Sequence, residues 1–207
     1  IQLTVDNIKS KYLKNIELDN QDKFKSNLQT IQKQIKQIEN LVNEFSDFAR
    51  MPKPILKDND LIKILNESIK LLSELDNSIK IDLTKNKDEI LLNCDKEQLT
   101  RVFINLIKNS IESIEEKSKK TANFEKKISI EISQNNDHIK ITLLDNGLGF
   151  SEIKGRIKDI LNPYFTTKKN GTGLGLSIVN KIVNDHNGNI EFIPVKDGAK
   201  IKINFIK

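Results

Sequence analysis

A heptad repeat of apolar residues near the start of the sequence is the feature that most constrains the fold. Its members are separated alternately by four and three residues, and they are Phe24, Leu28, Ile31, Ile35, Ile38, Val42 and Phe45. This spacing places them along one side of an α-helix and is typical of helices that pack against other helices. Pro52 and Pro54 predict where the helix ends, because proline cannot donate a helical hydrogen bond and disfavours helix in the residue before it.

A shorter apolar run at the same spacing precedes the long helix. It consists of Ile1, Val5, Ile8 and Tyr12, and a mostly polar stretch, residues 17–22, follows it as a predicted turn. Residues 1–54 are therefore predicted to form an antiparallel helical hairpin. Because the first helix spans only about 24 Å at 1.5 Å per residue, we expect the far half of the long helix to lack a partner within the chain. Such a seam must pack against another chain or against a segment outside this sequence, and the first possibility predicts a homodimer through a four-helix bundle.

Residues 55–207 mix helical and strand-like patterns. Helical spacing predicts helices over residues 60–72, 95–116 and 173–184, and strand-like runs are predicted over residues 79–83, 89–93, 128–133, 139–144, 189–195 and 199–206. The order lacks the regular alternation of a parallel α/β fold. We therefore expect an α+β domain, an α/β sandwich in which helices cover one face of a mixed sheet.

Composition narrows the range of functions. No apolar run approaches the roughly 18 residues that cross a bilayer, and a single cysteine, Cys94, excludes a disulfide framework and fits a reducing compartment. The net charge of +5 does not predict nucleic-acid binding, because lysines and glutamates are interspersed. Met51 is the only methionine, so we expect this chain to be a piece of a longer protein.

Two clusters of polar residues and glycines are candidates for chemistry. Asn105 and Asn109 lie four residues apart, which places both carboxamides on one face of a predicted helix. Asp145 ends a predicted strand, and Gly147 and Gly149 follow it. Taken singly, the first cluster is explained by partly exposed polar residues and the second by a turn.

A third cluster, Gly171-Thr-Gly-Leu-Gly-Leu176, leads directly into a predicted helix. Glycines before a helix N-terminus expose backbone N–H groups at the positive end of the helix dipole, which is a common arrangement for binding phosphate. The spacing is neither the dinucleotide-binding G-x-G-x-x-G pattern nor a Walker A loop.

In their order along the chain, the clusters resemble the N, G1, F and G2 boxes of sensor histidine kinases, with Pro163-Tyr-Phe-Thr-Thr-Lys168 in the place of the F box. These kinases belong to an ATPase superfamily that includes gyrase, heat-shock chaperone ATPases and mismatch-repair ATPases. The resemblance covers the chain from about Asp60 to its end. Phe45-Ser-Asp-Phe-Ala-Arg-Met-Pro52 also resembles the end of the second dimerisation helix in nitrogen-regulation-type sensor kinases.

The resemblance implies a site for ATP and Mg²⁺. Asn109 matches the asparagine whose side-chain oxygen ligates Mg²⁺, and Asp145 matches the carboxylate that accepts a hydrogen bond from the adenine amine. Asn105 and Lys168 match residues near the phosphates and are the catalytic candidates. The other residues expected to bind nucleotide are Gly147, Gly149, Phe165, Thr166, Thr167, Gly171, Thr172, Gly173, Leu174 and Gly175.

One departure from the family pattern concerns charge. Many relatives have Lys or Arg three residues after the second asparagine, where this chain has Glu112. The phosphates are then expected to be neutralised by Mg²⁺ together with Lys168, Lys169 or Arg101. The stretch 168–170 leaves a very short lid over the site.

A second departure concerns the phosphate acceptor. The family's phosphoaccepting histidine lies in a His-Glu-x-x-Asn-Pro box, which we expect to precede Ile1. His138 and His186 are both expected to be structural, since neither is surrounded by a set of metal ligands. This chain is therefore expected to bind ATP without phosphorylating itself.

The leading interpretation is the ATP-binding core of a sensor histidine kinase. The kinase would phosphorylate a histidine and relay the phosphoryl group to an aspartate of a response-regulator receiver domain. We expect it to act in the cytoplasm, and this chain itself is not expected to contact a membrane. An ATP-hydrolysing member of the superfamily is the alternative, but its general-base glutamate is replaced here by Asn105, which cannot take a proton from water. A third possibility is a docking module that binds nucleotide only as a structural ligand.

Overall fold

The computed structural model describes residues 1–16, 18–74, 78–150, 153, 156–168 and 171–207, and these form two compact units, residues 1–51 and 52–207. The first unit contains helix α1 (Gln2–Tyr12), a 3₁₀ turn η1 (Leu13–Asn15) and helix α2 (Leu18–Ala49). The turn predicted over residues 17–22 is wrong for residues 18–22, which begin α2; residue 17 lies outside the described residues. The misassignment arises because Asp and Asn favour helix N-termini as well as turns.

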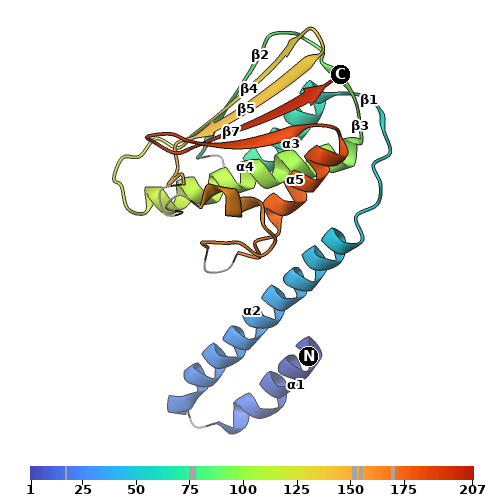
Figure 1. Ribbon diagram of the computed structural model, residues 1–207. Helices are drawn as coiled ribbons and strands as arrows, with labels where there is room; N and C mark the ends of the chain where they lie inside the picture. The colour runs from blue at the N-terminus through green and yellow to red at the C-terminus, as the bar shows by residue number, and fades with distance from the viewer. Residues whose placement is uncertain (17, 75–77, 151–152, 154–155, 169–170) are drawn as a thin grey trace. The chain divides into compact units, whose positions relative to one another are not determined.

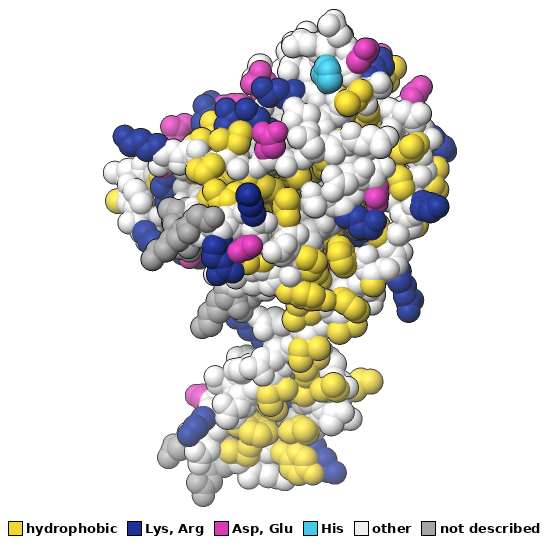
Figure 2. Space-filling model, viewed as in Figure 1, with side chains coloured by type: hydrophobic (Ala, Val, Ile, Leu, Met, Phe, Trp, Pro, Cys, Tyr) yellow, Lys and Arg dark blue, Asp and Glu magenta, His cyan; other side chains and the backbone are white. Residues whose placement is uncertain are grey.

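The two helices of the first unit share a small apolar contact. Val5 of α1 and Leu28 of α2 are buried, and Gln32 Nε2 donates a hydrogen bond of 2.8 Å to Asp6 Oδ1. Farther along α2 the apolar positions stay open, with Ile38, Val42 and Phe45 exposed by 59%, 56% and 50%. Hydrophobic side chains accordingly gather along the surface of this unit (Figure 2). Within the described residues of this unit, the unequal helices thus leave the far half of α2 without a partner helix, as the sequence predicted.

The second unit is built on a five-stranded sheet in the order β2-β4-β5-β7-β6. The strands are β2 (Lys80–Lys85), β4 (Lys127–Asn135), β5 (His138–Asp145), β7 (Ala199–Ile206) and β6 (Asn189–Pro194). β2 and β4 are parallel, whereas every other neighbouring pair in this sheet is antiparallel. Helices α3 (Leu61–Ser73), α4 (Lys96–Ser118) and α5 (Gly175–Asp185) cover one face of the sheet (Figure 1). The predicted α+β fold with a mixed sheet is confirmed.

Alternating burial along the strands explains why one face is covered. In β5, Ile139, Ile141 and Leu143 are buried, whereas Lys140 between them is exposed. Successive side chains of a strand point to opposite faces, so the apolar set packs under the helices and the polar set meets solvent. Among the described residues, no helix has the length and apolar character that crossing a bilayer requires.

Helix starts in this unit follow capping chemistry. Asp60 Oδ1 accepts a hydrogen bond of 3.0 Å from Ile62 N at the start of α3, and Asp95 Oδ1 accepts one of 3.0 Å from Gln98 N at the start of α4. Such caps satisfy N–H groups that have no partner within the helix. The two predicted helix starts are therefore confirmed.

A two-stranded sheet of β1 (Lys57–Asp60) and β3 (Leu91–Cys94) completes this unit, together with a 3₁₀ helix η3 (Ile157–Leu161). β1 was not predicted, because its sequence Lys-Asp-Asn-Asp has no apolar alternation and its pairing with β3 defines it. Cys94 is fully buried at the end of β3.

Candidate functional site

Asp145 lies at the end of β5 and is 3% exposed. Its Oδ1 accepts hydrogen bonds from the backbone N–H groups of Gly147 (2.9 Å) and Ala199 (3.3 Å), and its Oδ2 accepts one from Ser110 Oγ (2.9 Å). Burial raises the pKa of Asp145 above its ordinary value, and these hydrogen bonds and the charge of Lys117 oppose that rise only in part. A carboxylate has about four acceptor positions, so the three donors found among the described residues leave one on Oδ2.

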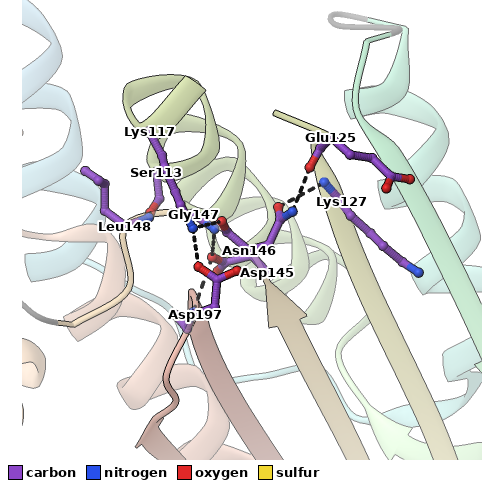
Figure 3. A network of polar contacts seen from close by, with 10 residues as sticks. Ser113, Lys117, Glu125, Lys127, Asp145, Asn146, Gly147, Leu148 and Asp197 are labelled. Atoms are coloured by element: carbon purple, nitrogen blue, oxygen red, sulfur yellow. Dashed lines mark hydrogen bonds and ion pairs between the residues drawn. The ribbon is translucent and has the colours of Figure 1, made fainter. Parts of the chain in front are cut away.

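The loop after β5 is fixed by a network of polar contacts (Figure 3). Asn146 Oδ1 accepts from Lys127 N at 3.0 Å, and its Nδ2 donates to Glu125 O at 2.7 Å. Lys117 of α4 donates to Asn146 O at 2.8 Å and forms an ion pair with Asp197. These contacts join the loop to α4, to the start of β4 and to the turn between β6 and β7.

Gly147 and Gly149 allow this loop to pack closely on its neighbours. A Cβ atom on Gly147 would lie 2.4 Å from Ser113 Oγ, the oxygen that accepts a hydrogen bond of 2.9 Å from Leu148 N. Gly149 has φ +68°, and a Cβ there would lie 2.1 Å from Gly198 O. Real Cβ atoms do not approach so closely, so both positions require glycine.

Asn105 and Asn109 lie one turn apart on α4 and are half-buried. A Cβ on Gly175, the first residue of α5, would lie 3.9 Å from Asn105 Oδ1, so Asn105 is next to the α5 N-terminus. Lys168 Nζ donates a hydrogen bond of 3.0 Å to Asn109 Oδ1 and forms an ion pair with Glu112. The structure therefore brings together the asparagine pair, the start of α5 and the last residue of the F-box segment.

The F-box segment and the glycine-rich segment are joined by short-range contacts. Thr166 Oγ1 accepts from Lys168 N at 3.1 Å, and a Cβ on Gly171 would lie 2.3 Å from the same oxygen. Gly173 has φ +71°, and its carbonyl accepts a hydrogen bond of 3.0 Å from Tyr164 N. These contacts bring the two segments side by side ahead of α5.

The remaining predicted site residues of these two segments differ in how far they are buried. Phe165 is half-buried, with the Arg156 guanidinium 5.2 Å from its ring centroid. Thr167 is exposed, and Leu174 is fully buried. Thr172 Oγ1 accepts a hydrogen bond of 3.3 Å from Leu174 N. Of the short predicted lid, Lys169 and Asn170 lie outside the described residues.

Several residues around the site were not predicted. Ser110 donates a hydrogen bond to Asp145, and Ser113 accepts one from the loop after β5. Gly198 packs against the same loop. The sequence held one usable signal, since Asn105, Asn109, Ser113 and Lys117 recur at intervals of four on α4 and so follow one another along the helix surface. Arg101 extends the same row by one turn.

Neither histidine is arranged as a metal ligand. His186 is 4% exposed; its Nε2 accepts from Asp95 N at 2.9 Å and its Nδ1 lies 2.7 Å from Ile182 O. The ring thus joins the end of α5 to the start of α4. His138 is exposed at the start of β5. Within the described part of the chain, no three His, Cys, Asp or Glu side chains gather as a metal site would require.

Comparison with known proteins finds an ATPase family model and sensor histidine kinases. Residues 94–206 match the family model described as histidine kinase-, DNA gyrase B- and HSP90-like ATPase. A putative sensor histidine kinase NtrY-like from Rickettsia bellii is 35% identical over 186 residues, which are 89% of this chain and 29% of that protein. The chain thus spans less than a third of the length of this curated relative.

Two solved structures resemble the fold. The catalytic domain of histidine kinase ThkA aligns with a TM-score of 0.63 and 25% identity, covering 73% of this chain and 95% of that one. Histidine kinase ThkA in complex with the response regulator protein TrrA aligns with a TM-score of 0.71 and 20% identity, covering 99% of this chain and 57% of the other.

Proposed function

The chain belongs to the histidine kinase-, DNA gyrase B- and HSP90-like ATPase family, and on that premise we propose that it binds Mg·ATP as the nucleotide-binding part of a protein histidine kinase. Family membership implies ATP binding, and the match to an NtrY-like sensor kinase agrees with the resemblance stated from the sequence. The observation that carries the proposal is Asp145, a buried carboxylate that retains one acceptor position among the residues the structure describes. We assign residues 1–54 to a dimerisation hairpin and residues 55–207 to the ATP-binding domain.

Asp145 is suited to recognise adenine. The open acceptor position on Oδ2 fits the exocyclic amine of the base, and Ser110 and Gly147 hold the carboxylate in place through its other acceptor positions. Gly147 and Gly149 let the loop after Asp145 pack closely on Ser113 and Gly198. A buried charged acceptor favours a donor over an acceptor in the ligand, so adenine is preferred to guanine, which carries a carbonyl at the same position.

Asn109 fits the role of Mg²⁺ ligand. Its Oδ1 already accepts from a cation, the Lys168 ammonium at 3.0 Å, so this oxygen lies where a positive group can reach it. Amide oxygens are suitable ligands for Mg²⁺, which commonly keeps several waters and binds phosphate oxygens as well. When bound, Mg²⁺ supplies charge neutralisation at the phosphates.

Asn105, Lys168 and the start of α5 would position the phosphates. The α5 N-terminus presents backbone N–H groups and the positive end of the helix dipole, and Asn105 lies beside it. Lys168 would neutralise phosphate charge, which is a main contribution of protein groups in phosphoryl transfer. Since Asn105 cannot act as a general base, this arrangement favours transfer to a protein acceptor over hydrolysis.

The protein partners follow as proposals of the same function. A receiver domain of a response regulator is the expected acceptor of the relayed phosphoryl group, which the solved complex of ThkA with TrrA supports by analogy. A second copy of the chain is the expected partner of the exposed seam of α2, where Ile38, Val42 and Phe45 lie. His186 is not available as phosphate acceptor, because it is buried and both ring nitrogens have partners.

Titration calorimetry with Mg·ATP and Mg·GTP tests the nucleotide assignment. We expect ATP to bind at least a hundredfold more tightly than GTP, and equal affinities would contradict the role of Asp145.

Incubation with γ-labelled ATP is expected to leave this chain without acid-labile label. Sedimentation at micromolar concentration tests the homodimer, which a monomer at all concentrations would exclude.

A further inference from the structure

The phosphate end of the site contains an ion pair that the proposed function does not explain. Lys168 forms this pair with Glu112 and also donates to Asn109 Oδ1 at 3.0 Å. Asn109 and Glu112 lie three residues apart on α4, so their side chains emerge on the same face of the helix. Lys168 comes from a different part of the chain and joins the segment before α5 to that face.

This arrangement conflicts with a loaded site. The amide oxygen of Asn109, which would face Mg²⁺, is occupied by an ammonium group. Two cations do not share one oxygen without strong repulsion, so Lys168 must move when Mg²⁺ and phosphates arrive. Glu112 opposes that movement, because it attracts Lys168 toward α4.

We propose that Glu112 and Lys168 form a latch that holds the phosphate end of the site closed in the absence of nucleotide and thereby lowers nucleotide affinity. This inference rests on the proposed function. Binding then includes an exchange, in which the Lys168 ammonium leaves Glu112 and Asn109 and turns to the phosphates. The latch gives a reason for an acidic side chain beside an anion site, where relatives with Lys or Arg would attract the phosphates directly.

The strength of the latch depends on how far solvent reaches its two side chains. The side chains of Lys168 and Glu112 are 37% and 39% exposed, so solvent screens their attraction. A ligand that binds only the open state loses affinity in proportion to the fraction of molecules that are closed. We therefore expect the latch to weaken nucleotide binding by roughly two- to fivefold.

A double-mutant cycle in binding affinity tests the latch without measuring phosphoryl transfer. Dissociation constants for Mg·ADP are measured by calorimetry for the unmodified chain, Glu112→Gln, Lys168→Met and the double variant. Glu116→Gln is the matched control, since it removes the same charge one turn farther along α4 at an exposed position. Adenosine is the ligand control, because it has no phosphates and does not require the latch to open.

With Lys168 present, Glu112→Gln is expected to tighten Mg·ADP binding two- to fivefold. In the Lys168→Met background the same change is expected to alter affinity by less than 1.5-fold, and Glu116→Gln should have no effect. Adenosine should bind equally to the chain with and without Glu112→Gln. Two results would overturn the latch. One is equal tightening in both backgrounds, since Glu112 would then act by repelling phosphate directly. The other is no tightening of Mg·ADP binding when Lys168 is present. If the unmodified chain bound neither ligand, the proposed function itself would fail.

Discussion

Replacing Asp145 by Asn separates base recognition from folding. The Asn side chain keeps an oxygen that accepts from Gly147 N and Ala199 N, as Asp145 Oδ1 does now. Its amide nitrogen replaces Oδ2 and donates to Ser110 Oγ, whose hydroxyl rotates to accept. All three contacts of Asp145 therefore have an equivalent in the variant, and we expect the fold to be retained.

Nucleotide binding, in contrast, should be lost. The adenine amine gives up a hydrogen bond to a charged acceptor, worth about 1.5–3 kcal/mol, and instead faces a second N–H donor, which costs about 1–3 kcal/mol more. At 1.4 kcal/mol for each factor of ten, the sum corresponds to a loss of roughly 10²- to 10⁴-fold in affinity.

Calorimetric titration with Mg·ADP measures this loss, and near-ultraviolet circular dichroism checks that packing is unchanged. Asp197→Asn is the matched control, since Asp197 is a largely exposed carboxylate in the same corner of the fold and pairs with Lys117. We expect the control to bind within threefold of the unmodified chain. A folded Asp145→Asn variant that binds equally well would refute the reasoning, because Asp145 would then make no contact with the base.

Three further predictions concern stability and reactivity. Because burial raises the pKa of Asp145, its contribution to stability is fully present below pH 3.8, its unperturbed pKa, and is lost as pH rises through the folded pKa. The unfolding temperature of Asp145→Asn relative to the unmodified chain should therefore increase from pH 4 toward neutrality. His186→Ala should lower the free energy of unfolding by about 2–4 kcal/mol in urea, since a cavity forms and Asp95 N loses its acceptor. Burial raises the pKa of Cys94 to about 11, so thiolate-directed reagents at pH 8 should label it only after unfolding.

Each of these has a result that would contradict it. A relative unfolding temperature that falls toward neutral pH would reverse the sign assigned to Asp145. His138→Ala, at an exposed position, is the control for His186→Ala, and equal effects of the two would show that burial does not matter. Rapid labelling of Cys94 in the native chain would show that β3 opens readily.

The sequence predicted those parts of the fold that local chemistry determines. Asp60 and Asp95 cap their helices because a side-chain oxygen reaches an N–H group two or three residues away. Likewise, β4 and β5 form where strand-like runs were predicted over residues 128–133 and 139–144, because apolar alternation is a local signal.

Contacts between residues far apart in the sequence could not be predicted from such local patterns. The partnership of Lys168 with Glu112 and that of Asp145 with Ala199 each join segments more than 50 residues apart. Gly198 was not among the predicted site residues, although the structure places its backbone against the loop after Asp145. The motifs thus pointed to candidate residues but not to the contacts that hold them in place.

The bond from Ala199 N to Asp145 has a consequence for dissecting the protein. All four motifs proposed to bind nucleotide end by residue 176, so a chain shortened before β7 would keep every one of them. It would nevertheless lose one donor to Asp145, the neighbouring strand of β5 and the close packing of Gly149 on Gly198. The presence of the four motifs would then overstate what a shortened chain can bind. An intact β7 is the better criterion for the proposed base site.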